Sequence, residues 1–215
     1  MGEAILRFDT RNEELLSFDA TGVAPLFSNP EASAAFARIP PEGAGMQGLA
    51  AEGCEDNILV LSGMLCYPTS PGKEAFAAKG AWVVAPPGEV HGYWNRSAKP
   101  VNLFIFRPRA RGQTSGPGSG PRVFAPAEPQ AAPRVTAYET PASRGEVLAL
   151  HPGENAVFGA ALVRAALVTA GRVMALSGRE KISLDEGEGL AFTGVPVEFV
   201  GVGGLSSVAV FSTAR

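Results

Sequence analysis

The chain is poor in the side chains that usually bind metals. Its 215 residues include two histidines, His91 and His151, and two cysteines, Cys54 and Cys66. Two cysteines cannot form a disulfide framework, and there is neither a C-x-x-C pair nor a Cys/His cluster with zinc-finger spacing. We therefore interpret both cysteines as reduced thiols.

Charge and long apolar runs are also scarce. Charged residues make up 18% of the chain, and the formal net charge is −3 with both signs mixed, which excludes the basic surface typical of nucleic-acid binding. The longest apolar run, AVFGAALVRAALVTAG, is too short to span a bilayer and is interrupted by Arg164. The first residues, MGEAILRFDTRNEE, lack the basic and apolar regions of a signal peptide. We expect a cytoplasmic protein without nucleic-acid or membrane partners.

What the sequence does contain is a series of strand-like runs separated by turn residues. They are rich in β-branched and aromatic residues, which favours strands. The clearest are ILVLSGMLCY (58–67), AWVVAPP (81–87), VNLFIFRP (101–108), RVMALSG (172–178), GLAFTG (189–194), VEFVGV (197–202) and SSVAVFS (206–212). Two stretches, 29–39 and 156–168, are compatible with either a helix or a strand.

A Gly/Pro-rich segment divides the chain into two similar halves. Residues 111–134 have the composition of a linker. Ile58–Gly63 resembles Val173–Gly178, and a glycine, Gly80 or Gly187, opens the next strand in each half. A repeat of this length indicates a duplicated domain. We predict one domain over 1–110, a linker over 111–134 and a second domain over 135–215.

The stretch 80–95 contains a specific motif. Gly80, Pro86, Gly88, His91 and Asn95 fit the pattern G-x5-P-x-G-x2-H-x3-N at every position. This pattern resembles the second motif of the cupin superfamily (RmlC-like jelly rolls), and the wording around PPGEVH is similar to the ChrR-like branch. The resemblance implies an all-β protein with two tandem cupin barrels of the double-stranded β-helix or jelly-roll type, a bicupin whose second barrel is degenerate.

The first cupin motif is altered in this chain. Counting back from Gly63 puts Asp56 at the family's glutamate position, with Glu52 and Ala50 at its two histidine positions. The three-histidine, one-glutamate metal site of many cupins is therefore excluded by counting. Because side chains alternate along a strand, we expect Glu52, Cys54 and Asp56 to share one face, close to His91 if the strands pair as in cupins.

This cluster suggests two kinds of chemistry. His91, Glu52 and Asp56, with Cys54 as a weaker candidate, could bind one divalent ion such as Zn, Mn or Fe. Alternatively, a histidine beside a buried carboxylate could move protons without a metal. We therefore expect a small-molecule enzyme, an isomerase, epimerase, cyclase or lyase acting on a polar carbonyl compound, with His91, Glu52 and Asp56 as catalytic residues.

Other interpretations stay open. The protein could be a non-catalytic ligand-binding or sensor bicupin, a metal-dependent dioxygenase with an atypical site, or a purely structural protein. His91 could cap its turn, Glu52 and Asp56 could lie in a solvated loop, and His151 precedes a surface turn. Aligning the two Ser-Gly ends places Gly171, Leu167 and Ala165 at the ligand positions of the second barrel, so we interpret that barrel as structural. We also expect a homodimer, with EAILRFDT as a candidate edge strand.

Overall fold

The protein forms two compact β units, and the start of the chain belongs to the second of them. The structure, a computed structural model, describes residues 4–11, 16–18, 21–45, 53–70, 73–88, 92–109, 120–126 and 133–214. The N-terminal unit comprises Glu13–Pro126, and the C-terminal unit comprises Met1–Asn12 with Ala127–Arg215. The described residues form strands and turns but no helix, so they contain no helix that could span a membrane.

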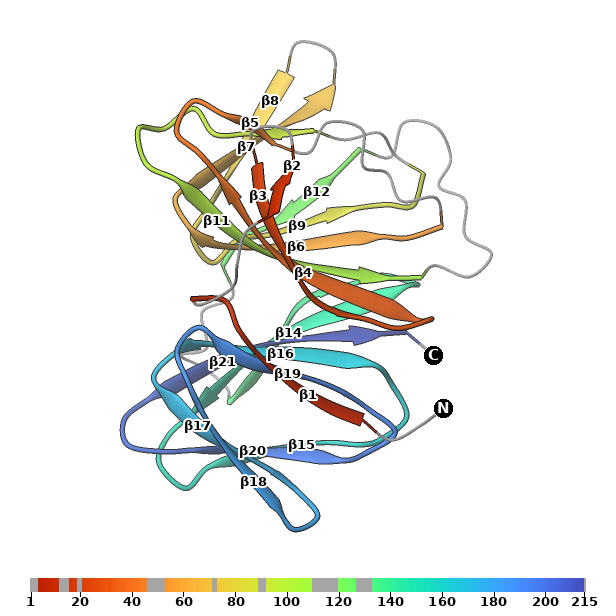
Figure 1. The fold of residues 1–215 in the computed structure, drawn as a ribbon, viewed down its shortest axis with the longest axis vertical. Helices are drawn as coiled ribbons and strands as arrows, with labels where there is room; N and C mark the ends of the chain where they lie inside the picture. The colour runs from red at the N-terminus through yellow and green to blue at the C-terminus, as the bar shows by residue number, and fades with distance from the viewer. Residues whose placement is uncertain are drawn as a thin grey trace. The chain divides into compact units, whose positions relative to one another are not determined.

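The N-terminal unit consists of two antiparallel sheets (Figure 1). The seven-stranded sheet has the order β12 (Arg122–Phe124), β9 (Trp82–Ala85), β6 (Asp56–Ser62), β11 (Val101–Pro108), β4 (Ala32–Ile39), β3 (Thr21–Ser28) and β2 (Leu16–Phe18). The four-stranded sheet has the order β5 (Ala44–Gly45), β10 (Tyr93–Trp94), β7 (Met64–Ser70) and β8 (Lys73–Ala78).

The C-terminal unit repeats this arrangement. Its six-stranded sheet has the order β1 (Ala4–Asp9), β19 (Glu188–Thr193), β16 (Arg164–Ala170), β21 (Ser206–Thr213), β14 (Ser143–Leu150) and β13 (Arg134–Glu139). Its four-stranded sheet has the order β15 (Asn155–Phe158), β20 (Val197–Gly201), β17 (Arg172–Ser177) and β18 (Glu180–Asp185). The all-β class predicted from the sequence is confirmed.

Alternation of side chains builds a separate core in each unit. In the N-terminal unit, Val101, Leu103 and Ile105 of β11 pack with Ile58 and Val60 of β6 and with residues of the four-stranded sheet. We call this cluster the N-terminal core. The C-terminal core contains, among others, Leu148, Leu150, Phe158, Ala166, Val168, Val208 and Val210. Residues two apart on a strand face the same side. A polar side chain that lies two residues from a core residue on the same strand therefore points inward as well.

Several local predictions can now be compared with the structure. The ambiguous stretch 29–39 contains strand β4, and 156–168 contains the end of β15 and the start of β16. The predicted linker 111–134 contains β12, in which Val123 pairs with Val83 and Phe124 with Trp82. Composition suggested a linker because Pro and Gly surround this short strand, but the strand extends the seven-stranded sheet.

The predicted first domain, 1–110, differs from the observed unit at its N-terminus. Strand β1, the proposed dimer edge strand, pairs with β19 of the C-terminal unit over the whole of Ala4–Asp9. Figure 1 shows this red strand among the blue and cyan strands of that unit. The pairing uses one edge of β1, which stands at the end of the six-stranded sheet, and Phe8 is buried with 4% exposure.

The internal repeat is real in topology, but the strand alignment taken from the sequence is wrong. In the N-terminal unit β6 lies between β9 and β11, and in the C-terminal unit β16 lies between β19 and β21. Strand β6 therefore corresponds to β16, whereas the two Ser-Gly ends had aligned it with β17. Gly63 after β6 and Gly171 after β16 both have positive φ, 79° and 75°, as expected for equivalent tight turns.

Candidate functional site in the N-terminal barrel

Asp56 opens strand β6 and shares the face of that strand that carries Ile58 and Val60 of the N-terminal core. Its backbone pairs with Ala85 of β9, and Asp56 is 2% exposed. The alternative that Asp56 lies in a solvated loop is therefore wrong. A carboxylate removed from water in this way needs a compensating charge or hydrogen bonds.

Arg107 on β11 supplies the compensating charge. Its Nε donates to Oδ1 of Asp56 at 2.6 Å, and its Nη2 donates to Oδ2 at 3.3 Å. This is the two-point geometry in which a guanidinium binds a carboxylate most strongly. Burial alone would lower the pKa of Arg107, but the charge and hydrogen bond of Asp56 raise it above the ordinary value, so Arg107 stays cationic.

Sequence reasoning missed Arg107 although a signal was present. Val101, Leu103 and Ile105 point into the N-terminal core, and two residues further along the same strand Arg107 faces the same way. An arginine at the end of an apolar strand is also compatible with exposure to solvent, so the strand pattern alone does not decide its direction.

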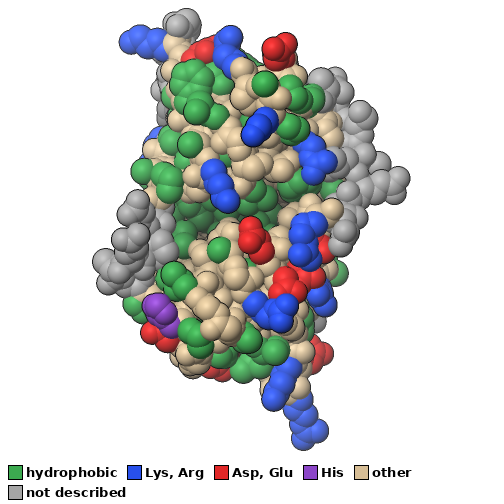
Figure 2. Space-filling model, turned by 90° about the vertical axis from the view of Figure 1, so that its left-hand side faces the viewer, with side chains coloured by type: hydrophobic (Ala, Val, Ile, Leu, Met, Phe, Trp, Pro, Cys, Tyr) green, Lys and Arg blue, Asp and Glu red, His purple; other side chains and the backbone are tan. Residues whose placement is uncertain are grey.

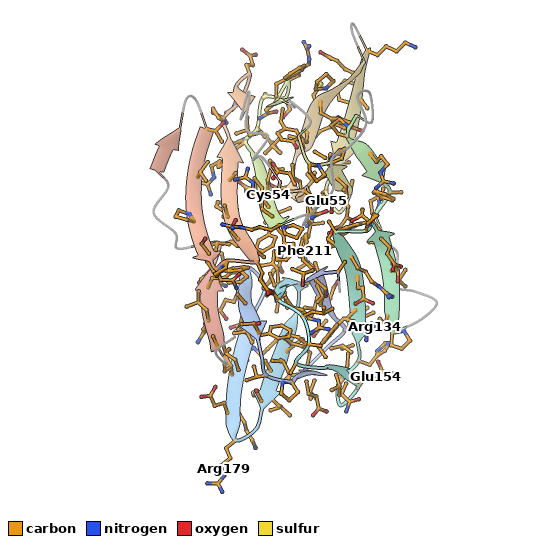
Figure 3. All side chains as sticks on the ribbon, turned by 90° about the vertical axis from the view of Figure 1, so that its right-hand side faces the viewer. Cys54, Glu55, Arg134, Glu154, Arg179 and Phe211 are labelled. Atoms are coloured by element: carbon orange, nitrogen blue, oxygen red, sulfur yellow. The ribbon has the colours of Figure 1, made fainter. Side chains whose placement is uncertain are left out.

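The charges of this ion pair contribute to the pKa shifts of two further groups, Tyr93 and Cys54. Tyr93 of β10 belongs to the N-terminal core and is 0% exposed; burial and the charge of Asp56 raise its pKa well above the ordinary value, against an opposing effect of Arg107. Burial and then Asp56 also raise the pKa of the Cys54 thiol, while Arg109 and Arg107 lower it. Both groups are therefore neutral near pH 7. Cys54 and its neighbour Glu55 are labelled in Figure 3.

The described part of the cupin-like motif has a structural explanation. Gly80 and Gly88 adopt φ values of 84° and 75°, which glycine tolerates best. The side chain of Asn95 donates to the carbonyl oxygens of Ile39, Pro40 and Lys99 at 3.3, 3.0 and 2.7 Å. Asn95 is 1% exposed, and it ties the motif to neighbouring loops.

Two predicted site residues, Glu52 and His91, lie outside the described residues. Among the residues that are described, no group of three or more His, Cys, Asp and Glu side chains could hold a metal ion. Asp56 already binds a guanidinium through both oxygens, and that cation would repel a second one. The described side chains of the site therefore do not fit a metal ion.

His151, the other histidine, is exposed, and its backbone amide donates to Oε2 of Glu154 at 2.9 Å. Its position in a surface turn agrees with the structural role expected from the sequence. On the face drawn in Figure 2, acidic and basic side chains are interspersed.

Comparison with known structures identifies the fold. Protein Ylba from E. coli is 14% identical with a TM-score of 0.79, covering 98% of this chain and 90% of its own. The bacterial pirin YhhW from E. coli, solved with nickel(II), is 15% identical with a TM-score of 0.70, covering 99% of this chain and 100% of its own.

A third similar structure is the salicylate 1,2-dioxygenase of Pseudoaminobacter salicylatoxidans in complex with gentisate. It is 13% identical with a TM-score of 0.72, and the match covers 98% of this chain and 82% of that enzyme. No family model and no curated protein matches the sequence. The chain therefore has the bicupin fold over its full length, as the motif predicted, and the comparisons give no support to the narrower ChrR-like resemblance.

Proposed function

We propose that the N-terminal barrel is the site of a small-molecule enzyme, an isomerase, epimerase, cyclase or lyase acting on a polar carbonyl compound. The observation that carries the proposal is the Asp56–Arg107 pair on the inward faces of β6 and β11. A cation held beside an apolar core stabilises the negative charge that develops on a carbonyl oxygen when a neighbouring C–H proton is removed.

In this proposal each residue has a separate role. Arg107 faces the developing oxyanion, and Asp56 holds the guanidinium in place. Both oxygens of Asp56 are engaged by Arg107, so we assign proton transfer to His91 and Glu52 rather than to Asp56. Histidine is suited to this task because its ordinary pKa lies near neutrality.

Deuterium exchange tests the reaction class directly. Purified protein is incubated in D2O with pyruvate, 2-oxobutyrate or dihydroxyacetone, and the loss of the hydrogen next to the carbonyl is followed by NMR. We expect exchange above the buffer rate for at least one compound, and a loss of about a hundredfold or more in His91→Ala, since general-base catalysis contributes roughly that factor.

Arg107→Met should lose the exchange as well, whereas Arg38→Met should keep it. Arg38 is a suitable control because its Nε donates to Oδ1 of Asn102 at 3.0 Å in an exposed pair of the same sheet. Exchange that survives in Arg107→Met would remove Arg107 from the site. Absence of exchange with every compound would contradict the reaction class.

A binding or sensor function is the second candidate, and one observation favours it. Arg107 neutralises the charge of Asp56, and the raised pKa values keep Tyr93 and Cys54 neutral near pH 7. A shift in melting temperature with one of these compounds, without deuterium exchange, would support binding alone. The salicylate dioxygenase with gentisate is an example of a similar fold that binds a small molecule. An atypical metal-dependent dioxygenase would require ligands from Glu52 and His91.

A further inference from the structure

The C-terminal barrel carries charged side chains on its inward face, where the sequence alignment had placed small and apolar ones. Arg164 of β16 pairs with Ser212 of β21, and Ser212 pairs with Arg144 of β14. Directly paired residues share one face of a sheet. Because Ala166 and Val168 on β16 belong to the C-terminal core, Arg144, Ser212 and Arg164 form an inward-facing row.

A buried carboxylate lies beside this row. Glu146 is 2% exposed, and Arg134 of β13 binds it at two points, with Nε 2.8 Å from Oε1 and Nη2 2.7 Å from Oε2. Nη2 of Arg144 approaches the same Oε1 at 2.9 Å and donates to Oγ1 of Thr136 at 2.6 Å. Two guanidinium groups therefore share one carboxylate.

Phe158 joins the third arginine to this group. Its ring centroid lies 4.6 Å from Cζ of Arg134 and 5.4 Å from Cζ of Arg164, distances at which a cation is attracted to an aromatic ring. We call Arg134, Arg144 and Arg164 the arginine cluster. Arg134 is labelled in Figure 3.

The cluster has unused binding capacity. Arg134, Arg144 and Glu146 together carry one excess positive charge. Nε of Arg144 is buried and has no hydrogen-bond partner among the described residues, and leaving such a donor unpaired costs free energy. The side chains of Arg134 and Arg144 are each 43% exposed, so a solute can reach them.

From these observations we propose that the arginine cluster binds a small oxyanion, a carboxylate or a phosphate group. A planar guanidinium presents paired donors that match the oxygens of both groups. The added anion would neutralise the excess charge and lessen the repulsion between Arg134 and Arg144. This site lies in the C-terminal unit and does not depend on the function proposed for the N-terminal barrel.

Thermal unfolding of the full chain with added sodium phosphate or sodium malonate, at constant ionic strength set by sodium chloride, tests the proposal. A ligand that binds the folded state raises the melting temperature with its concentration, and the two salts distinguish phosphate from carboxylate. Titration calorimetry with the more effective salt gives the dissociation constant. We expect Arg144→Gln to weaken binding about tenfold or more, the value of one charge-assisted hydrogen bond.

Two further variants make the test specific. Arg172→Gln removes an exposed arginine paired with Asp185 in the same unit and should leave binding unchanged. Glu146→Gln removes the competing carboxylate and should strengthen binding. Arg144→Gln should fold, because Glu146 keeps Arg134 as its partner. Equal stabilisation of Arg144→Gln, Arg172→Gln and wild type would indicate a general salt effect and overturn the proposal, as would the absence of any effect on the wild type.

Discussion

At the scale of single residues, the Asp56–Arg107 pair makes the stability of the N-terminal unit depend on a buried charge. The side chain of Asp56 is 2% exposed and that of Arg107 is 21% exposed. Arg107→Met leaves a buried carboxylate without its cation, and we expect it to reduce the free energy of unfolding by about 3 kcal/mol, the lower end for a broken buried pair. Urea unfolding measures this loss.

The double variant Asp56→Leu, Arg107→Met separates the two contributions. Because it removes both charges, we expect it to recover most of the stability lost in the single variant. Arg38→Met should change the free energy of unfolding by less than about 0.5 kcal/mol. A loss in Arg107→Met no larger than in Arg38→Met would mean that the pair is solvated in solution.

Cys54 reports on the same charges. Burial raises the pKa of its thiol and the charge of Asp56 raises it further, so the folded state holds the proton more tightly than the unfolded state. The associated stability is complete below the unfolded pKa, about 8.5, and is lost as pH rises toward the folded pKa. Asp56→Asn removes one raising effect and leaves Arg109 and Arg107, so the pKa of Cys54 should fall.

Alkylation by iodoacetamide as a function of pH, read at each cysteine by mass spectrometry, measures this change. Only the thiolate reacts, so each unit by which the pKa falls increases the rate below the midpoint about tenfold. Cys66 is 0% exposed and should react slowly in both proteins, so faster alkylation of Cys66 in Asp56→Asn would indicate unfolding rather than a pKa change. An unchanged or raised midpoint for Cys54 in Asp56→Asn would contradict the predicted effect of Asp56.

At the scale of elements, the strands and turns that the sequence predicted correctly are those determined by residues close together in the chain. Strands β11, β19 and β21 coincide with apolar runs, and the turn glycines Gly80 and Gly88 follow from a local motif. The sequence also predicted Asp56 as a site residue, and the structure buries it on the face of β6 that carries Ile58 and Val60. Arg107, in contrast, lies 51 residues from Asp56, and no local pattern joins two charges across that separation.

The misaligned repeat has a similar physical origin. A strand that ends in Ser-Gly is a short pattern that any tight hairpin can use, and it occurs after β6 and again after β17. Hydrogen-bonded neighbours, rather than similar ends, establish which strands correspond. That correspondence makes Arg164 the equivalent of Asp56 in the first barrel. The alignment of the Ser-Gly ends had placed Gly171 at this position, so the arginine cluster was not predicted.

Strand β12 allows a test of an element that composition assigned to a linker. Replacing Arg122–Phe124 with Gly-Ser-Gly removes the apolar side chains opposite Trp82 and Val83. We expect a loss of about 1–3 kcal/mol in the free energy of unfolding and faster amide exchange in β9, measured by mass spectrometry. Unchanged exchange in β9 would support the original assignment of this segment to a linker.

At the scale of the whole molecule, the chain starts in one unit, builds the other and then returns. Strand β1 pairs with β19, and Arg7 on β1 binds Glu188 at 2.6 Å although 181 residues separate them. Phe8 packs so closely on Gly189 that a Cβ atom there would lie 2.4 Å from its ring. The C-terminal unit is therefore assembled from both ends of the sequence.

This arrangement predicts different behaviour for the two units when they are produced separately. Fragment 13–126 contains all strands of its own sheets and should unfold cooperatively. Fragment 127–215 lacks β1, which leaves one edge of β19 unpaired and the site of Phe8 empty, so we expect it to be less stable by at least the cost of a Phe→Ala substitution, about 3–5 kcal/mol.

Adding a peptide of residues 1–12 to this fragment should restore its thermal transition measured by circular dichroism. The same peptide with Phe8→Ala should restore much less, because it supplies the backbone pairing without the buried ring. If fragment 127–215 melts at the same temperature with and without the peptide, β1 contributes nothing to the C-terminal unit.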